Sequence, residues 1–151
     1  MNAQLPLYGL MLIAGTGIPL MASMNAQLAI RLGNPALATG IVFLVGGLAT
    51  IPPMIAIGFP SRDTLLQAPP LYYLAGLLVT LYALSITWAG PKIGIGNAIF
   101  LVLLAQLFTA AAIDHFGLFG APQSPVGVRR ALGLALMALG VFLARKPLIP
   151  T

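Results

Sequence analysis

Long uncharged runs dominate the chain, and short stretches rich in proline, glycine and polar residues separate them. The clearest run lies between Lys92 and Asp114, where 21 residues carry no charge. As a helix it is ~31 Å long, which is close to the hydrocarbon thickness of a bilayer. Runs of this kind predict an all-α membrane protein with five spanning helices, at about residues 5–30, 35–59, 71–89, 92–116 and 126–144.

The breaks between the runs carry turn signals. Gly33 suits a helix end and Pro35 the first position of the next helix. Pro52-Pro53 should kink or break the second helix, and Gly90-Pro91-Lys92 is expected to turn the chain into the fourth. Residues 60–70 are expected to be a short polar loop. Because every connection is short, the sequence predicts one transmembrane domain over residues 1–151.

The fifth run is shorter than the others. Only 14 residues separate Arg130 from Arg145, a helix of ~21 Å. It can span a bilayer if Arg129 and Arg130 extend their side chains to the headgroups.

Composition narrows the function classes. Hydrophobic residues make up 60% of the chain and charged residues 6%, whereas a soluble domain has about 25% charged residues. The net charge of +5 is scattered, without the basic run that nucleic-acid binding favours. No cysteine, no glutamate, one histidine and two aspartates leave no metal cluster and no catalytic constellation. We therefore expect an integral membrane protein that is not an enzyme and needs no cofactor.

Polar side chains inside the runs are candidates for lining a solute pathway. An amide in hydrocarbon needs a partner, which is a neighbouring helix, water or a solute. Packing between helices and lining of a cavity both remain open for these groups, and Trp88 also suits an interfacial belt. A cavity of uncharged groups suits a neutral or weakly polar metabolite. The candidates are Gln106, near the middle of its run, and Asn25, Gln27, Asn97, Tyr82 and Trp88.

Ionisable residues gather at one helix end. Asp114 is the only acid beside an apolar run, and no carboxylate lies near a mid-span position. Asp114 is either an interfacial anchor or, if it turns inward at a dimer interface, a gate that meets Arg129 or Arg130. The gate candidates are Asp114, His115, Arg129 and Arg130.

The basic residues are almost balanced between the two sides. Five spans place Arg62, Arg129 and Arg130 on one side, and Arg31, Lys92, Arg145 and Lys146 on the other. Three against four is a weak orienting signal, so we expect insertion in both directions, unless one residue of bias or a partner fixes it. Two inverted copies would supply ten helices around a central site, as inverted repeats do in transporters.

Several stretches resemble the YdcZ family of the drug/metabolite transporter (DMT) superfamily. They are MNAQLAIRLGNP (24–35), FLVGGLA (43–49), PKIG (91–94), LLAQL (103–107), IDHFGLFG (113–120) and RRALGLALMALGVFLAR (129–145). The resemblance implies five spans in the bacterial inner membrane, as one half of an inverted pair. Members of the superfamily move small organic metabolites or drugs.

These observations together predict a dual-topology transporter working as an antiparallel homodimer, or with a homologous chain. Its expected partners are the lipid bilayer and a small organic solute. A passive dual-topology channel and a non-transport assembly or accessory protein remain the alternatives.

Overall fold

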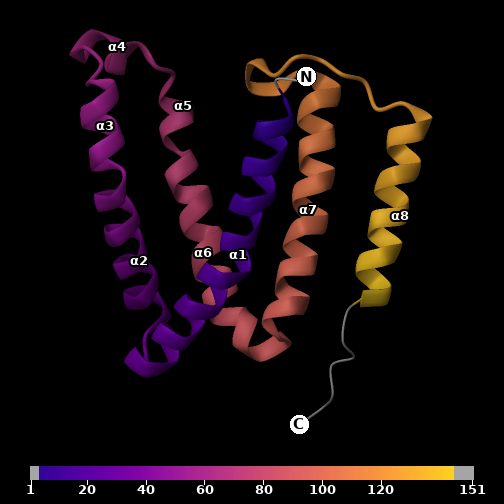
Figure 1. Cartoon of the computed structure of the whole chain (residues 1–151), viewed down its shortest axis with the longest axis horizontal. Helices are drawn as coiled ribbons and strands as arrows, with labels where there is room; N and C mark the ends of the chain where they lie inside the picture. Colours follow the sequence, from indigo (N-terminus) through magenta and orange to yellow (C-terminus); the bar gives the residue numbers. More distant parts are fainter. Residues whose placement is uncertain (1–3, 145–151) are drawn as a thin grey trace. The chain divides into compact units, whose positions relative to one another are not determined.

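The computed structural model describes residues 4–144, and every regular element within that range is helical. Along the sequence, the chain divides into two compact units between Lys92 and Ile93. The first unit holds α1 (Leu5–Leu32), α2 (Pro35–Ala49), α3 (Ile51–Ile57), α4 (Arg62–Gln67), α5 (Pro70–Tyr73) and α6 (Ala75–Ile93). The second holds α7 (Ile95–Phe116), the 3-10 turn η1 (Leu118–Gly120) and α8 (Val128–Ala144) (Figure 1).

Four helical segments of the described chain are long and apolar enough to cross a membrane: Leu5–Leu32, Pro35–Ile57, Pro70–Ile93 and Ile95–Phe116. Where the sequence predicted a fifth span, the structure has α8, a helix of 17 residues that is not among these four. At ~1.5 Å per residue α8 is ~26 Å long, shorter than an average hydrocarbon core. The charges of Arg145 and Lys146, which entered the count of basic residues, lie outside the described residues.

The turn between α1 and α2 forms as the sequence predicted. Gly33 ends α1 in the left-handed region, at φ +62°, where glycine carries no steric penalty. The side chain of Asn34 then accepts a hydrogen bond from the backbone N–H of Leu37 at 3.0 Å, and Pro35 occupies the first position of α2. Residues 31–35 therefore join two membrane-length helices through a tight, capped corner.

Prolines act differently at two places. Pro52-Pro53 interrupts the second run as predicted, because α2 ends at Ala49 and α3 starts at Ile51. The prediction that Gly90-Pro91-Lys92 reverses the chain is wrong, because these residues belong to the C-terminal end of helix α6. A proline this close to a helix end removes one backbone bond, and the helix continues to Ile93. Gly94, at φ +87°, makes the break instead.

Two further boundaries differ from the sequence prediction. The polar loop at 60–70 contains α4, whose first turn is capped by Ser61 accepting from the backbone N–H of Thr64 at 3.2 Å. The third run starts with the short helix α5 and is continuous only from Ala75 onward. These short helices use the caps and prolines that the loop sequence supplies.

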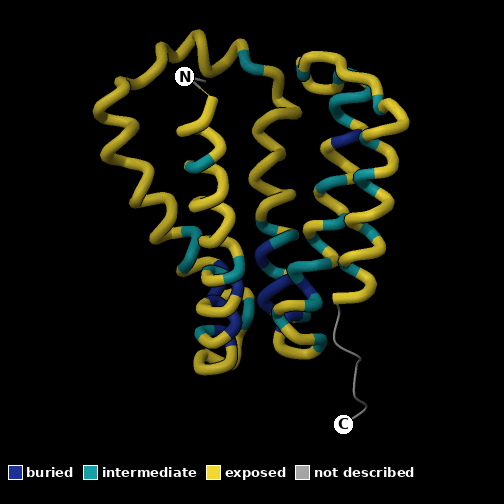
Figure 2. The backbone as a smooth tube through the Cα atoms, turned by 45° about the vertical axis from the view of Figure 1, so that its right-hand side comes forward, coloured by how far each residue is buried: buried dark blue, intermediate teal, exposed yellow. Residues whose placement is uncertain are grey.

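The packed part of the first unit is built from small side chains near the α1–α2 turn (Figure 2). Ala22, Ala26 and Ala29 recur at spacings of four and three, which places them on one face of α1. Small residues let membrane helices approach closely. Away from this end, α1 and the α2–α3 segment diverge and their residues are largely exposed (Figures 1 and 2). The buried apolar residues of this unit are Ala22, Ala26, Ala29, Ala38, Ala83 and Ile86.

Candidate functional site

A buried amide links three helices of the first unit. Asn25 of α1 is 1% exposed, and its Nδ2 donates to Oγ1 of Thr87 in α6 at 2.6 Å. The same nitrogen donates a longer bond, 3.4 Å, to Oγ1 of Thr39 in α2. Its acceptor atom Oδ1 is buried and has no hydrogen-bond partner within residues 4–144. Asn25 thus acts as a packing group through its nitrogen and leaves an acceptor unused at its oxygen.

An open groove runs between α1 and α2 beside this amide, with a volume of about 850 Å³. It brings together two of the predicted lining residues, Asn25 and Gln27. Arg31, which the sequence analysis did not select for lining, lies at the end of the groove next to the turn. The lining residues are Gly17, Leu20, Met21, Ser23, Met24, Asn25, Gln27, Leu28 and Arg31 of α1, with Ile41, Val42 and Val45 of α2.

The two amides predicted on α7 have different surroundings. Asn97 is half-buried, and its Nδ2 donates to the backbone oxygen of Ile93 at 2.9 Å. Gln106 is exposed near the middle of the helix and has no hydrogen-bond partner in the described chain. In a bilayer, an amide at this position would need a partner from outside its own helix.

The aromatic candidates lie outside the groove. Tyr82 is half-buried, and its hydroxyl is enclosed without a hydrogen-bond partner among the described residues. Trp88 is 58% exposed, and Nζ of Lys92 lies 3.4 Å from the centre of its ring. A cation over an indole face at a helix end is typical of the membrane interface.

The four gate candidates lie around the junction of α7 and α8. Asp114 pairs with Arg130 of its own chain, Oδ2 to Nη2 at 2.5 Å, and the two side chains are 39% and 37% exposed. The backbone N–H of Ser124 donates to the backbone oxygen of Asp114 at 2.7 Å. Arg129 is exposed. The carboxylate therefore anchors the end of α7 to the start of α8, and a contact with a second copy would require this pair to open.

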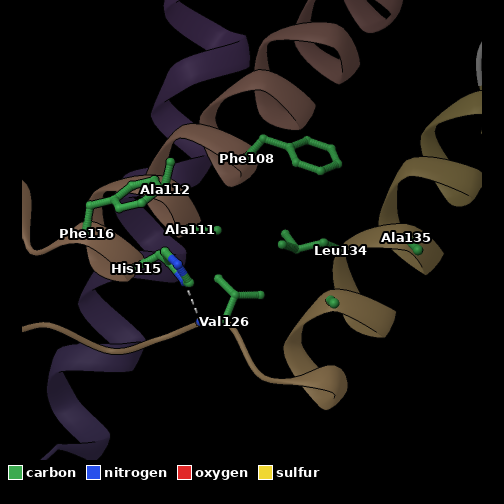
Figure 3. A pocket seen from close by; sticks show the side chains of 9 residues that line it. Phe108, Ala111, Ala112, His115, Phe116, Val126, Leu134 and Ala135 are labelled. Atoms are coloured by element: carbon green, nitrogen blue, oxygen red, sulfur yellow. Dashed lines mark hydrogen bonds between the residues drawn. The ribbon is translucent and has the colours of Figure 1, made fainter.

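His115 fixes the connecting loop to α7. Its Nδ1 accepts a hydrogen bond from the backbone N–H of Val126 at 3.0 Å (Figure 3), and its backbone oxygen accepts from Nε2 of Gln123 at 3.2 Å. Because Nδ1 accepts, a neutral imidazole carries its proton on Nε2. The ring also meets Phe116 edge to face, with centroids 4.7 Å apart. The neighbouring Asp-His pair thus acts through two separate partners.

A second pocket, of about 360 Å³, lies between α7 and α8 (Figure 3). His115 is the polar side chain in an otherwise apolar lining. That lining is Phe108, Ala111, Ala112, Phe116, Val126, Ala131, Leu134 and Ala135. Since its imidazole already holds the loop through Nδ1, this pocket offers a ligand little beyond apolar contact.

Sequence reasoning missed three residues of the first unit: Thr39, Thr87 and Arg31. The threonines lie 14 and 62 positions from Asn25, so no local spacing connects them to it. Arg31 was visible as the first charge of the chain, four positions after Gln27 and hence on the same helix face. That spacing is the signal that could have placed it in the groove. Within residues 4–144 no group of three or more His, Cys, Asp or Glu residues is arranged to hold a metal.

The chain matches a known protein family. A family model described as "Putative inner membrane exporter, YdcZ" covers residues 7–143. No curated protein and no solved structure matches the chain. The match confirms the predicted resemblance, agrees with membership of the DMT superfamily, and favours a transporter over an enzyme. With four membrane-length helices in the described chain, it places the protein in the bacterial inner membrane. The chain belongs to the YdcZ family of inner-membrane exporters.

Proposed function

We propose that this chain exports a small organic metabolite or drug by alternating access, as an antiparallel pair of identical or homologous subunits. The observation that carries the proposal is Gln106, an exposed amide without a partner in the middle of a membrane-length helix. An amide that is left without a hydrogen-bond partner in hydrocarbon costs roughly several kcal/mol of free energy. A functional partner, either water and solute in a cavity or a second copy, offsets this cost.

The small size of the chain supports the paired arrangement. Four membrane-length helices and the shorter α8 are few to enclose a pathway and still face lipid. The near balance of basic residues weakens any single orientation, and inverted repeats in transporters form their site at the repeat interface. An inverted second copy would give a wall of ten helices from one gene.

The proposed lining groups are the uncharged polar side chains selected from the sequence. Asn25 and Gln27 contribute through the α1–α2 groove, and Gln106 through α7. Asn97, Tyr82 and Trp88 are kept as further lining candidates, of which Tyr82 has an enclosed hydroxyl in need of a partner. Uncharged donors and acceptors of this kind suit hydrogen-bonded organic solutes.

The gate remains a part of the proposal. Asp114 and Arg130 would exchange their pairing during the transport cycle, with His115 and Arg129 beside them. A partly exposed pair can open at small cost, because such pairs contribute only about 0–1 kcal/mol. The closed pair would correspond to one end state of the cycle.

One observation favours the accessory-protein alternative. The nitrogen of Asn25 is bound by Thr39 and Thr87, as expected if polar groups only hold helices together. A passive channel is the other alternative, and its flux would not saturate. The test must therefore separate saturable flux, passive flux and no flux.

The decisive experiment measures flux in proteoliposomes of the wild type and of the Gln106→Ala variant. The probes are benzenesulfonate, nicotinamide and tetraethylammonium, which represent an anion, a neutral solute and a cation. Saturable flux of at least one probe is expected, with a loss of about tenfold in Gln106→Ala. Gln67→Ala, at the exposed end of α4, is the matched control and should leave flux unchanged.

Two readouts decide between the alternatives. Cross-linking should recover a dimer, and tags at the C-terminus should be accessible from both faces of the membrane. Flux that does not saturate would replace the transporter with a channel. Absence of flux for all three probes, together with C-termini on one face only, would overturn the proposal.

A further inference from the structure

The α1–α2 groove changes character along its length. Gly17, Leu20, Met24, Gln27 and Arg31 recur at spacings of three and four, so they form one stripe along α1. From Gly17 to Arg31 this stripe is ~21 Å long on a straight helix. The stripe is apolar at its Gly17 end and carries an amide and then a guanidinium toward the turn. The groove therefore matches a molecule with an apolar body and a polar head.

Arg31 supplies the only formal charge in the groove lining. Within residues 4–144 the single ion pair is that of Asp114 with Arg130, in the other unit, so Arg31 has no acidic partner there. An arginine in the last turn of a helix is favourable with the helix dipole in any case. That position alone does not indicate a ligand, and a second observation is needed.

The second observation is the unused acceptor of Asn25. This side chain is 1% exposed and lines the groove, and its Oδ1 has no hydrogen-bond partner in the described chain. Asn25 precedes Arg31 by six residues, which is ~9 Å along the helix. A hydroxyl or an N–H group in the groove would satisfy this oxygen. The two groups together call for one molecule that carries both an anionic group and a hydrogen-bond donor.

We propose that the groove is the solute site and selects an amphiphilic organic anion. Its carboxylate or sulfonate pairs with the Arg31 guanidinium, which can bind such a group through two parallel hydrogen bonds. Its apolar body contacts Met24, Leu28 and Ile41 of the groove lining, and a donor group at its far end reaches Oδ1 of Asn25. Organic cations are repelled by Arg31. This inference rests on the proposed export function and names the class of its substrate.

Binding to the purified full-length protein tests the inference. Octanoate, 8-hydroxyoctanoate and octylammonium are measured by equilibrium dialysis in an uncharged maltoside detergent, against empty micelles. Octanoate should bind at least about tenfold more tightly than octylammonium. The Arg31→Gln variant should lose this preference for octanoate, and the Arg31→Lys variant should keep part of it. Arg62→Gln, an exposed arginine at the start of α4, is the matched control and should change nothing.

The hydroxyl tests the second contact. 8-hydroxyoctanoate should bind more tightly than octanoate to the wild type, and this advantage should disappear in Asn25→Leu. If Asn25→Leu does not fold, the Arg31 variants still decide the question. Equal binding of octanoate and octylammonium, or equal losses in Arg31→Gln and Arg62→Gln, would overturn the inference. So would a co-purified anionic phospholipid that Arg31→Gln releases and octanoate does not displace, because the groove would then be a lipid site.

Flux and octanoate binding together distinguish a failure of this inference from a failure of the export function. If the proteoliposomes transport nicotinamide or tetraethylammonium and Arg31→Gln leaves that flux intact, export stands and the anion site is refuted. If octanoate binds through Arg31 while none of the flux probes moves and the C-termini lie on one face only, the anion site is supported and the export function fails.

Discussion

The two units satisfy their polar groups in different ways. At the end of α7, Asp114 and His115 are each bound to the following loop or to α8, so the chain itself provides their partners. In the first unit, the α1–α2 groove exposes Gln27 and Arg31 and encloses the unpaired oxygen of Asn25. Asp114 and His115, which the sequence offers as its clearest cluster of ionisable residues, therefore have a structural role. The less conspicuous polar groups of α1 are free to bind something else.

The largest expected effect concerns Asn25, whose buried amide joins three helices of the first unit. Asn25→Leu removes the donor shared by Thr39 and Thr87 and leaves both hydroxyls buried without it. We expect a loss of about 1–3 kcal/mol in the free energy of unfolding, measured by circular dichroism during titration with a denaturing detergent. Gln27→Leu, two residues away and exposed, is the control and should stay within about 0.5 kcal/mol of the wild type. Equal losses in the two variants would show that Asn25 does not hold these helices together.

The second prediction concerns the loop that closes the second unit. Gly117 has φ +62°, and a Cβ there would lie 3.4 Å from both the backbone oxygen of Ala121 and Cβ of Gln123. Gly117→Ala should destabilise the protein by about 1–2 kcal/mol, since an L-residue is strained in this region. The measurement is the same detergent titration.

Its control is Gly133→Ala on α8, where the added Cβ meets no atom within 4 Å. There alanine should be neutral or stabilising by up to about 1 kcal/mol, because it favours helix more than glycine does. A loss at Gly133 as large as that at Gly117 would remove the special role of the turn after α7.

The smallest expected effect concerns the ion pair. Asp114→Asn should cost no more than about 1 kcal/mol, because both partners are more than a third exposed. The double variant Asp114→Asn, Arg130→Gln should lose no more than either single variant, since both changes remove the same contact. Asp63→Asn in α4 is the control. A loss that is additive in the double variant would show that the two residues do not act on each other in the membrane.

Much of the fold could be predicted from local signals. The spans follow from uncharged runs, and Gly33 and Pro35 place the first corner because their backbone preferences act within a few residues. The same local logic failed at Pro91, where the deciding feature was the distance of the proline from the helix end. It also missed α4, whose capping serine is a weak signal in a polar loop.

The candidate site was harder to predict, since it depends on which helices meet. Asn25 could be selected because an amide in an apolar run is conspicuous, but Thr39 and Thr87 lie on other helices. The sequence named Arg129 or Arg130 as a partner for Asp114, but at a dimer interface. The structure pairs Asp114 with Arg130 of the same chain, across 16 positions and a loop. Local pattern identifies which groups need a partner, and tertiary packing determines which partner they find.

The stacking of Lys92 on Trp88 has a practical consequence for following this protein at work. Trp88 is the only tryptophan of the chain and is 58% exposed at the end of α6. An ammonium group 3.4 Å from the ring centre is well placed to perturb indole emission. The native protein therefore contains its own single fluorophore, and its spectrum should shift whenever solute or a conformational step changes that end of α6. Since the chain also has no cysteine, a second dye can be added at any chosen position through one introduced thiol, without a competing reaction.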